Sequence, residues 1–390
     1  MTIVSLLDTD FYKFTMQQIV FHRFSEALVE YQFFCRTEGV DFSDCLDGIK
    51  ENIKLLCQLR LSDTEIAYLK STGVFKADYL MFLKTFQLDE KAIKISHQNA
   101  LSITVKGPWA QVILFETPLL AIINEAYYQT KCAQPSFTEG REHLAEKIAL
   151  LKSAVSPGEL KFADFGSRRR FSSAWQEEVL TTLQAEVPEY FMGTSNIFYA
   201  QQLNLKPIGT MAHEYVQAMQ VLAPNLRESQ RFAFQEWLAE YAGQLGVALS
   251  DTYTRKVFFK DFDKAFCLAF QGVRQDSGDP FGFAEAFIQQ LEDFNIDPKT
   301  KTIIFSDSLT FPVMIDLQKS FANKIKLAFG IGTNLLNDVG FQPLNIVIKM
   351  TKCNDLPVAK ISDDPQKIMA TDSTYMQRLR LLFDIKHKAA

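Results

Sequence analysis

The stretch FADFGSRRRFS, residues 162–172, sets the pattern from which the fold of this chain can be inferred. The apolar run FADF is followed by Gly166 and Ser167 and then by three arginines, and a helix is predicted from about Ser172 to Glu186. A short apolar run that ends in glycine and polar residues before a helix is typical of a buried strand in an α/β protein. Consecutive arginines are more often a solvated helix face, but arginines directly after a buried strand predict an anionic ligand.

Six further stretches repeat this order of strand, polar loop and helix. Their polar ends are rich in Gly, Ser, Thr and Asp and span residues 193–196, 210–213, 250–252, 274–279, 306–308 and 330–333. Seven such units in a row predict a parallel α/β barrel, with an open doubly wound sheet as the less favoured alternative. Each polar end alone is more often an ordinary turn or helix cap. Because the loops that follow barrel strands converge on one rim, the seven together predict a site there.

The segments on either side of this region predict a second, α+β domain. Its first part, residues 1–140, combines a helix expected over 11–24, amphipathic helices over 43–59 and 63–73, and strands over 30–36, 102–107 and 111–116. The barrel is expected over residues 141–342. Beyond it, LNIVIKMTKCNDLPVAKISD (344–363) indicates two strands joined by a turn at 353–355. We therefore expect residues 343–390 to complete the N-terminal domain.

The composition of the chain excludes several classes of protein. With 41 basic and 46 acidic residues the formal charge is −5, which argues against a nucleic-acid partner. The N-terminus lacks the features of a signal peptide, and no apolar run approaches the ~18 residues of a membrane helix. The six cysteines form no C-x-x-C pair, so we expect reduced thiols rather than disulfides or a structural zinc. These features predict a cytoplasmic protein without a membrane partner.

His213 is the candidate for chemistry at the predicted rim. It is the one histidine of five that stands at a strand end. A lone histidine is more often a structural hydrogen-bonding residue, but a position beside Thr210 and near Asp251 favours a nucleophile or general base. The strand ends carry no lysine, which argues against a Schiff-base aldolase. No H-E-x-x-H or P-loop motif is present.

Two of the loops have features expected of a phosphate-binding site. GIGTN (330–334) is a glycine turn before a helix, which presents backbone N–H groups to a phosphate. RQDSGDP (274–280) supplies an arginine and two carboxylates, a set that favours a sugar phosphate with bound Mg²⁺. For both stretches an ordinary tight turn is the alternative.

Eight stretches in order carry a resemblance to a known family. They are TDFYKFTM (9–16), FFCR (33–36), FADFGSRRRFS, GTSNIFYA (193–200), PIGTMAHEY (207–215), VRQDSGDP (273–280), FSDSL (305–309) and FGIGTNLLND (329–338). In this order they resemble bacterial nicotinate phosphoribosyltransferases, of the type II phosphoribosyltransferase family. The resemblance implies an irregular α/β barrel beside an α+β domain. It also implies transfer of phosphoribosyl from 5-phosphoribosyl-1-pyrophosphate to nicotinate in NAD salvage, with ATP as co-substrate.

The resemblance also assigns residues to the pyridine base. Phe165 and Tyr12 would stack on the two faces of the ring, with Tyr12 supplied by the other subunit of a homodimer. Arg168 would face the carboxylate of nicotinate, and Arg274 the ring or phosphate side of the pocket. Arg169 and Arg170 would serve phosphates or surface pairs. Nicotinamide-using relatives have Asp where this chain has Ser195, so Ser195 favours the acid as substrate.

The remaining assignments concern phosphoryl and ribosyl groups. By resemblance, His213 becomes phosphorylated by ATP, and Asp251 orients its imidazole. The predicted phosphate and ribose ligands are Arg36 (across the dimer interface), Asp276, Asp279, Asp307, Gly330, Gly332, Thr333, Lys349 and Lys360, with Mg²⁺ bound through the substrate phosphates. Three alternatives stay open at this point: a nicotinamide phosphoribosyltransferase, a sugar-phosphate lyase or isomerase, and a non-catalytic nucleotide-binding homologue.

Overall fold

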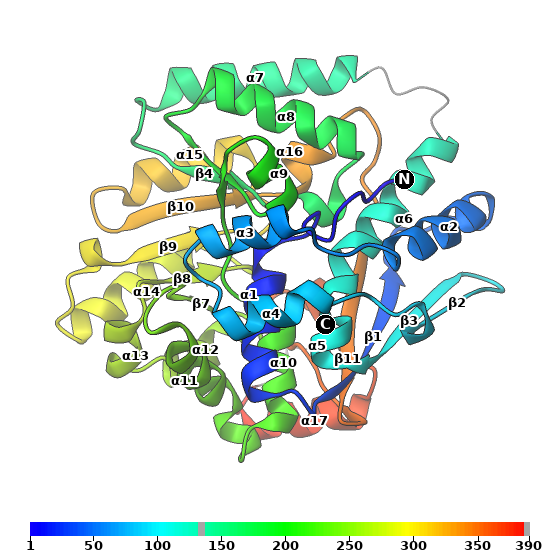
Figure 1. Ribbon diagram of the computed structural model, residues 1–390. Helices are drawn as coiled ribbons and strands as arrows, with labels where there is room; N and C mark the ends of the chain where they lie inside the picture. Colours follow the sequence, from blue (N-terminus) through cyan, green and yellow to red (C-terminus); the bar gives the residue numbers. More distant parts are fainter. Residues whose placement is uncertain (132–136, 386–390) are drawn as a thin grey trace.

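A parallel and an antiparallel sheet organise the computed structural model, which describes residues 1–131 and 137–385 (Figure 1). Cys132 and His387, two residues considered in the sequence, fall outside these ranges. The five cysteines within the ranges form no disulfide. Of the helices in the described ranges, none is both long and apolar enough to span a bilayer.

The parallel sheet contains the seven strands predicted from the strand-to-helix units. They are β4 (Phe162–Asp164), β5 (Phe191–Thr194), β6 (Lys206–Pro207), β7 (Val247–Leu249), β8 (Gly272–Gln275), β9 (Thr302–Phe305) and β10 (Lys326–Ile331). Their order is β6-β5-β4-β10-β9-β8-β7, and all neighbours are parallel. The sheet curls into a half-barrel whose two edges are β6 and β7. The predicted fold class, an irregular parallel barrel beside an α+β domain, is confirmed.

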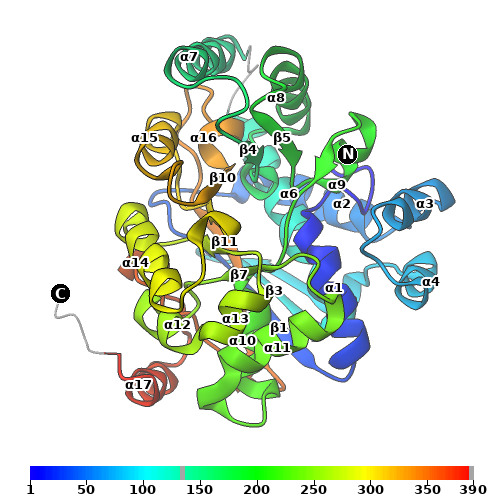
Figure 2. The ribbon, with the colours of Figure 1, turned by 90° about the vertical axis from the view of Figure 1, so that its left-hand side faces the viewer.

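Helices follow the parallel strands, and capping side chains mark the start of several of them. Figure 2 shows α14 and α15 on the outer side of the curled sheet. Ser172 accepts a hydrogen bond from the backbone N–H of Trp175 at the start of α8, and Asn196 does the same for Tyr199 in α9. The helices of this half are α7 (Thr138–Ala154), α8 (Ser173–Glu186), α9 (Ile197–Gln202), α10 (His213–Leu222), α11 (Ser229–Tyr241), α12 (Arg255–Asp261), α13 (Lys264–Ala269), α14 (Pro280–Asp293), α15 (Phe311–Phe321) and α16 (Thr333–Leu336).

The antiparallel sheet joins the two ends of the chain. Its order is β12-β11-β1-β3-β2, from β1 (Leu28–Cys35), β2 (Ile93–His97), β3 (Leu101–Pro108), β11 (Ile346–Cys353) and β12 (Leu356–Pro357). After β12 the chain leaves this sheet and packs on the helices of the half-barrel. There the ring of Phe383 stacks on that of Tyr253, with centroids 4.1 Å apart, just after α17 (Ser373–Leu382).

One predicted strand is wrong. Residues 111–116 are helical, in α5 (Trp109–Val112), a 3₁₀ turn (Ile113–Phe115) and the start of α6 (Glu116–Lys131). A continuous apolar run has no period, and here it is buried on all sides. The strand β2 was not predicted. The other N-terminal helices are α1 (Phe11–Arg23), α2 (Leu46–Leu56), α3 (Asp63–Ser71) and α4 (Ala77–Thr85).

Helix α1 lies at the opening between the two edges of the half-barrel. The backbone N–H of Phe11 donates to the carbonyl of Ser195, which follows β5 (2.7 Å). The hydroxyl of Thr15 donates to the carbonyl of Thr210, which follows β6 (2.7 Å), and Tyr241, ahead of β7, donates to the carbonyl of Thr15. These contacts place the N-terminal helix at the rim where the parallel strands end.

Candidate active site

A cavity of about 530 Å³ lies at the carboxyl ends of the parallel strands. Its walls come from α1, β11, the loops after β4, β5, β6, β8, β9 and β10, and the segment 360–369. Most of the predicted site residues line it: Tyr12, Arg36, Phe165, Arg168, Ser195, His213, Arg274, Asp276, Asp307, Gly332, Thr333, Lys349 and Lys360. Residues that are up to 348 positions apart in sequence, from Tyr12 to Lys360, therefore meet in one cavity of one chain.

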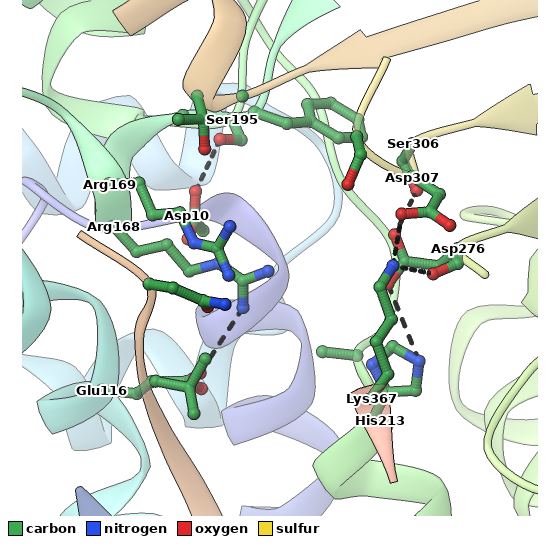
Figure 3. Close-up of a pocket in the computed structure, with 18 of the residues that line it drawn as sticks. Asp10, Glu116, Arg168, Arg169, Ser195, His213, Asp276, Ser306, Asp307 and Lys367 are labelled. Atoms are coloured by element: carbon green, nitrogen blue, oxygen red, sulfur yellow. Dashed lines mark hydrogen bonds and ion pairs between the residues drawn. The ribbon is translucent and has the colours of Figure 1, made fainter. Parts of the chain in front are cut away.

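Two chemically different walls face each other across this cavity (Figure 3). One wall presents the guanidinium groups of Arg168 and Arg169. The opposite wall holds His213, Asp276 and Lys367. A ligand that fills the cavity thus has arginines on one side and an imidazole with carboxylates on the other.

The three arginines of the opening motif take different positions. A 3₁₀ turn, Ser167–Arg169, brings both Arg168 and Arg169 to the cavity. The guanidinium of Arg168 lies 3.6 Å from the carboxylate of Glu116. Burial and the neighbouring Arg168 lower the pKa of Arg169 to about 10. The expectation that Arg170 serves phosphates or a surface pair is wrong, because it is fully buried and donates to both carboxylate oxygens of Asp8, at 2.7 and 2.9 Å.

The aromatic side chains predicted for the base come from the same chain. Tyr12 and Phe165 both line the cavity, and so does Arg36 at the end of β1. The expectation that a partner subunit supplies Tyr12 and Arg36 is therefore wrong for this structure. The physical reason is that α1 packs on the half-barrel of its own chain, through Phe11 and Thr15.

Gly330 has a different role from the predicted one. It does not line the cavity and lies beneath the ring of Phe165. A Cβ at this position would lie 2.2 Å from that ring. Glycine therefore makes room for Phe165 here, and the prediction that Gly330 contacts a phosphate is wrong. Gly332 and Thr333, two residues further along, do line the cavity.

His213 is held by a buried chain of charges. Its Nε2 lies 2.7 Å from Oδ1 of Asp251, whose Oδ2 accepts from Lys360 at 2.7 Å. Burial, followed by the charge of Lys360, lowers the pKa of His213 to about 4, against the opposing effect of Asp251. The imidazole is thus neutral near pH 7, with the proton on Nε2 pointing to Asp251. No residue of the described ranges hydrogen-bonds Nδ1, which leaves its lone pair free. Asp251 itself lies behind His213 and outside the cavity wall.

The acidic wall is formed by Asp276 and Asp307. Burial alone would raise the pKa of Asp276, but Arg274, 3.8 Å away, helps to lower it to about 2. Oδ1 of Asp276 accepts from Ser306 at 2.7 Å. Asp307 is paired with Lys367, a residue that the sequence argument missed and whose ammonium also donates to the carbonyl of Asp276 (2.7 Å).

Asp279 is not part of this wall. Its two carboxylate oxygens accept from the backbone N–H groups of Phe281 and Gly282, at 3.1 and 3.0 Å, and so cap the N-terminus of α14. The prediction of Asp279 as a ribose or Mg²⁺-water ligand is wrong. The D-P sequence at 279–280 is itself a helix-start signal, with Pro at the first helical position.

The sequence analysis did not predict Lys13, Glu116 and Glu214, which form a buried ionic cluster below the arginine wall, next to the predicted Lys349. The ammonium of Lys13 lies 2.6 Å from Glu116 and 2.8 Å from Glu214. Both carboxylates and Lys349, whose ammonium is 3.9 Å from Glu116, line the cavity. Burial alone would raise the pKa of Glu116, but the charges of Lys13 and Lys349 lower it to about 2. In Glu214, burial raises the pKa to about 6. In the sequence, Lys13 directly follows Tyr12 and Glu214 directly follows His213. Their positions next to predicted site residues are the signal that could have identified them.

Ser195 has an unexpected acidic neighbour. Its hydroxyl donates to Oδ1 of Asp10 at 2.5 Å, and Thr117 donates to Oδ2 at 3.0 Å. A carboxylate therefore lies in the cavity wall although residue 195 is not Asp. Because both of its oxygens accept hydrogen bonds from the protein, Asp10 acts here as a scaffold for Ser195.

One group of side chains has the composition of a metal site. In the described ranges, ligand atoms of His213, Asp251 and Asp276 lie within 4.8 Å of one another. However, both oxygens of Asp251 are occupied, by His213 and by Lys360. The ammonium of Lys360 thus supplies the positive charge that a cation would otherwise bring, and the geometry favours an orienting triad over a metal centre.

The fold and the cavity define an enzyme with a small-molecule site, rich in both basic and acidic side chains, at the carboxyl ends of a parallel sheet. The chain belongs to the nicotinate phosphoribosyltransferase (NAPRTase) family: residues 160–387 match the model of that family, and residues 7–124 match the model of its N-terminal domain. The resemblance inferred from the eight sequence stretches is therefore confirmed.

Individual relatives extend the match over the whole chain. A nicotinate phosphoribosyltransferase of Acidovorax sp. (strain JS42) is 50% identical over 397 residues, which cover 99% of each chain. The crystal structure of a nicotinate phosphoribosyltransferase from Vibrio cholerae is 38% identical, with a TM-score of 0.95 over 99% of this chain and 95% of that one. A second crystal structure, of the enzyme from Porphyromonas gingivalis, is 33% identical with a TM-score of 0.92 over 98% and 100% of the two chains.

Proposed function

We propose that this enzyme transfers phosphoribosyl from 5-phosphoribosyl-1-pyrophosphate to nicotinate, giving nicotinate mononucleotide and pyrophosphate, and couples the transfer to ATP hydrolysis. The observation that carries the proposal is a single cavity in which an aromatic and arginine wall faces a neutral histidine bound to Asp251. The family relationship supports the transferase activity. The ATP step rests on the histidine geometry and on the resemblance.

The base would bind at the arginine wall. Tyr12 and Phe165 supply two ring faces for stacking on the pyridine, and Arg168 supplies a guanidinium for the carboxylate. The guanidinium lies 3.6 Å from Glu116, close enough to be oriented but without a short hydrogen bond that a ligand would have to replace. A neutral amide would gain less from this guanidinium, so the site favours nicotinate over nicotinamide.

His213 would accept the γ-phosphoryl group of ATP. Its Nδ1 lone pair attacks phosphorus, the bond from phosphorus to the bridging oxygen breaks, and ADP leaves. The proton on Nε2 stays in the hydrogen bond to Asp251, which stabilises the positive charge that develops on the ring. Water later hydrolyses the phosphohistidine and restores the free enzyme.

In the glycosyl step, pyrophosphate leaves C1 of the ribose and the pyridine nitrogen attacks the same carbon. The chain would contribute orientation and charge stabilisation, through Arg36, Lys349 and Lys360 on the anionic groups. Asp276 and Asp307 are the carboxylates available to ribose hydroxyls or to water bound to Mg²⁺. Since both already have cationic neighbours, Mg²⁺ would bind mainly through the substrate phosphates.

The assay that tests this function measures pyrophosphate and mononucleotide formation from phosphoribosyl pyrophosphate. Nicotinate and nicotinamide are compared, each with and without ATP. We expect product with nicotinate, more of it when ATP is present, and little with nicotinamide. Equal or better turnover of nicotinamide would favour the amide-specific alternative. Absence of product with either base would contradict the proposal.

Lys349 makes anion binding depend on pH near neutrality. Burial lowers its pKa to about 7, against the opposing effect of Glu116. The ammonium of Lys349 is therefore charged below about pH 7 and neutral above it. Glu214 becomes negatively charged above about pH 6, which also weakens anion binding as the pH rises. We expect the Kd for inorganic pyrophosphate to rise by up to about tenfold between pH 6 and 8, in step with the loss of protonated Lys349.

Calorimetric titration of wild type and Lys349→Arg checks this expectation. Arginine stays charged over the whole range, so its profile should be flatter, and the titration of pyrophosphate itself is common to both proteins. Identical pH profiles would show that Lys349 does not contribute its charge to the anion.

Two further predictions, a homodimer and a cytoplasmic location, rest on the sequence argument alone.

A further inference from the structure

Helix α7 lies behind the part of the cavity wall formed by residues 332–338. Its residues Glu139, His143 and Lys147 follow one another at intervals of four, which places them on one face of the helix. That face is turned toward residues 334–340, and Figure 2 shows α16 below α7. None of the three residues lines the cavity.

The contacts of this face converge on Asp338. The ammonium of Lys147 donates to Oδ2 of Asp338 and to the carbonyl oxygen of Asn334, the latter at 2.6 Å. Nδ1 of His143 lies 3.1 Å from Oδ1 of Asp338 and 3.3 Å from its carbonyl oxygen. Glu139 also contacts this segment, at Gly340 (φ +84°). A Cβ at position 340 would lie 2.1 Å from the carboxylate of Glu139, so glycine is needed to leave room for it.

The position of Asp338 explains why its carboxylate needs the positive charge of Lys147. It lines the cavity together with Gly332, Thr333 and Asn334, on the side predicted to receive phosphate. An uncompensated carboxylate at that place would repel a phosphate. Lys147, with a side chain only 14% exposed, supplies the compensating charge from outside the cavity.

The same segment also supports the arginine wall. The side-chain amide of Asn337 donates to the carbonyl of Arg169 at 2.9 Å, and the N–H of Phe171 donates to the carbonyl of Leu336 at 2.8 Å. A shift of residues 334–338 would therefore move the backbone that carries Arg169 as well.

We propose that Lys147, assisted by His143, is a positioning residue for the phosphate side of the cavity: it neutralises Asp338 and holds residues 334–338 in place. The identity of the anion, phosphoribosyl pyrophosphate, rests on the proposed function. Lys147 touches no substrate and acts only through Asp338 and Asn334.

The test compares steady-state kinetics of wild type, Lys147→Met, Lys147→Arg and Lys152→Met. We expect Lys147→Met to raise KM for phosphoribosyl pyrophosphate about tenfold, the effect of one lost charge pair, with kcat and KM for nicotinate changed less than about twofold. Lys147→Arg should restore most of the affinity. Lys152 lies on the same helix and pairs with Glu186, so Lys152→Met is the matched control and should behave as wild type.

A double variant separates charge compensation from support of the fold. In Lys147→Met with Asp338→Asn no carboxylate is left to neutralise, so KM for phosphoribosyl pyrophosphate should return to within about threefold of wild type. A double variant as impaired as Lys147→Met, or a parallel loss of kcat, nicotinate affinity and melting temperature, would overturn the proposal.

Binding of inorganic pyrophosphate keeps this inference distinct from the proposed function. Calorimetry needs no turnover, and we expect Lys147→Met to bind pyrophosphate about tenfold more weakly than wild type. If wild type forms no mononucleotide but shows this difference, the proposed function fails and the role of Lys147 stands. Equal affinity in the two proteins would overturn the role of Lys147.

Discussion

Replacing His213 by Asn is expected to abolish ATP hydrolysis while slow, ATP-independent phosphoribosyl transfer persists. Asn cannot form the phosphoenzyme, so phosphate release from ATP should fall by about a thousandfold or more, to the background of the assay. It retains a polar side chain of similar size, so the cavity should still bind both substrates. ATP stimulation of transfer should disappear, because ATP helps only through the difference in affinity between the phosphorylated and free enzyme.

Transfer of radioactive phosphate from γ-labelled ATP to the protein provides the direct measurement. The label should be acid-labile in wild type and absent from His213→Asn. His97→Asn is a suitable control, since His97 lies on β2 beside Asp41 and away from the cavity. If His213→Asn still hydrolyses ATP in proportion to product, the nucleophile lies elsewhere and the proposed role of His213 is wrong.

Arg168→Ala is expected to raise KM for nicotinate by about 10- to 150-fold. A charge-assisted hydrogen bond to a carboxylate contributes about 1.5–3 kcal/mol, which corresponds to this range. Nicotinamide has no carboxylate, so its weaker binding should change far less and the preference for the acid should shrink. The melting temperature should change little, because within the described ranges the only ion pair of the Arg168 side chain is its 3.6 Å contact to Glu116.

Kinetics with both bases for wild type, Arg168→Ala and Arg168→Lys test this assignment. Lysine keeps the charge without the planar fork of donors, so Arg168→Lys should lie between the other two. Arg169→Ala is the neighbouring comparison and should affect the phosphate substrate more than the base. Unchanged nicotinate kinetics in Arg168→Ala would show that another group binds the carboxylate.

Much of the fold could be predicted because it is encoded in local patterns. Most strands of the half-barrel are short apolar runs that end in glycine or polar residues before a helix, and all seven strands lie at or just before the predicted polar ends. The convergence of the loops on one rim follows from parallel strand order. For this reason the sequence alone places His213, Arg168 and Asp276 at one site.

Local patterns misled where one motif serves two purposes. The sequence RQDSGDP contains two carboxylates that are equivalent in sequence, but Asp276 faces the cavity whereas Asp279 caps α14. Similarly, of the three adjacent arginines, Arg168 and Arg169 line the cavity, whereas Arg170 is buried against Asp8. The choice depends on the direction of each side chain, which changes within a single turn.

The sequence by itself determined the succession of strands and helices along the chain, the loops that hold polar groups and the family to which the chain belongs, because these depend on periodicity and on motifs a few residues long. Only the tertiary structure decided which distant residues meet. It placed Tyr12 and Phe165 of the same chain in one cavity, paired Lys13 with Glu116 and Glu214, and set Lys147 behind Asp338. These contacts join residues 100 or more positions apart and arise from the packing of α1, α6, α7 and α10, which no local pattern encodes.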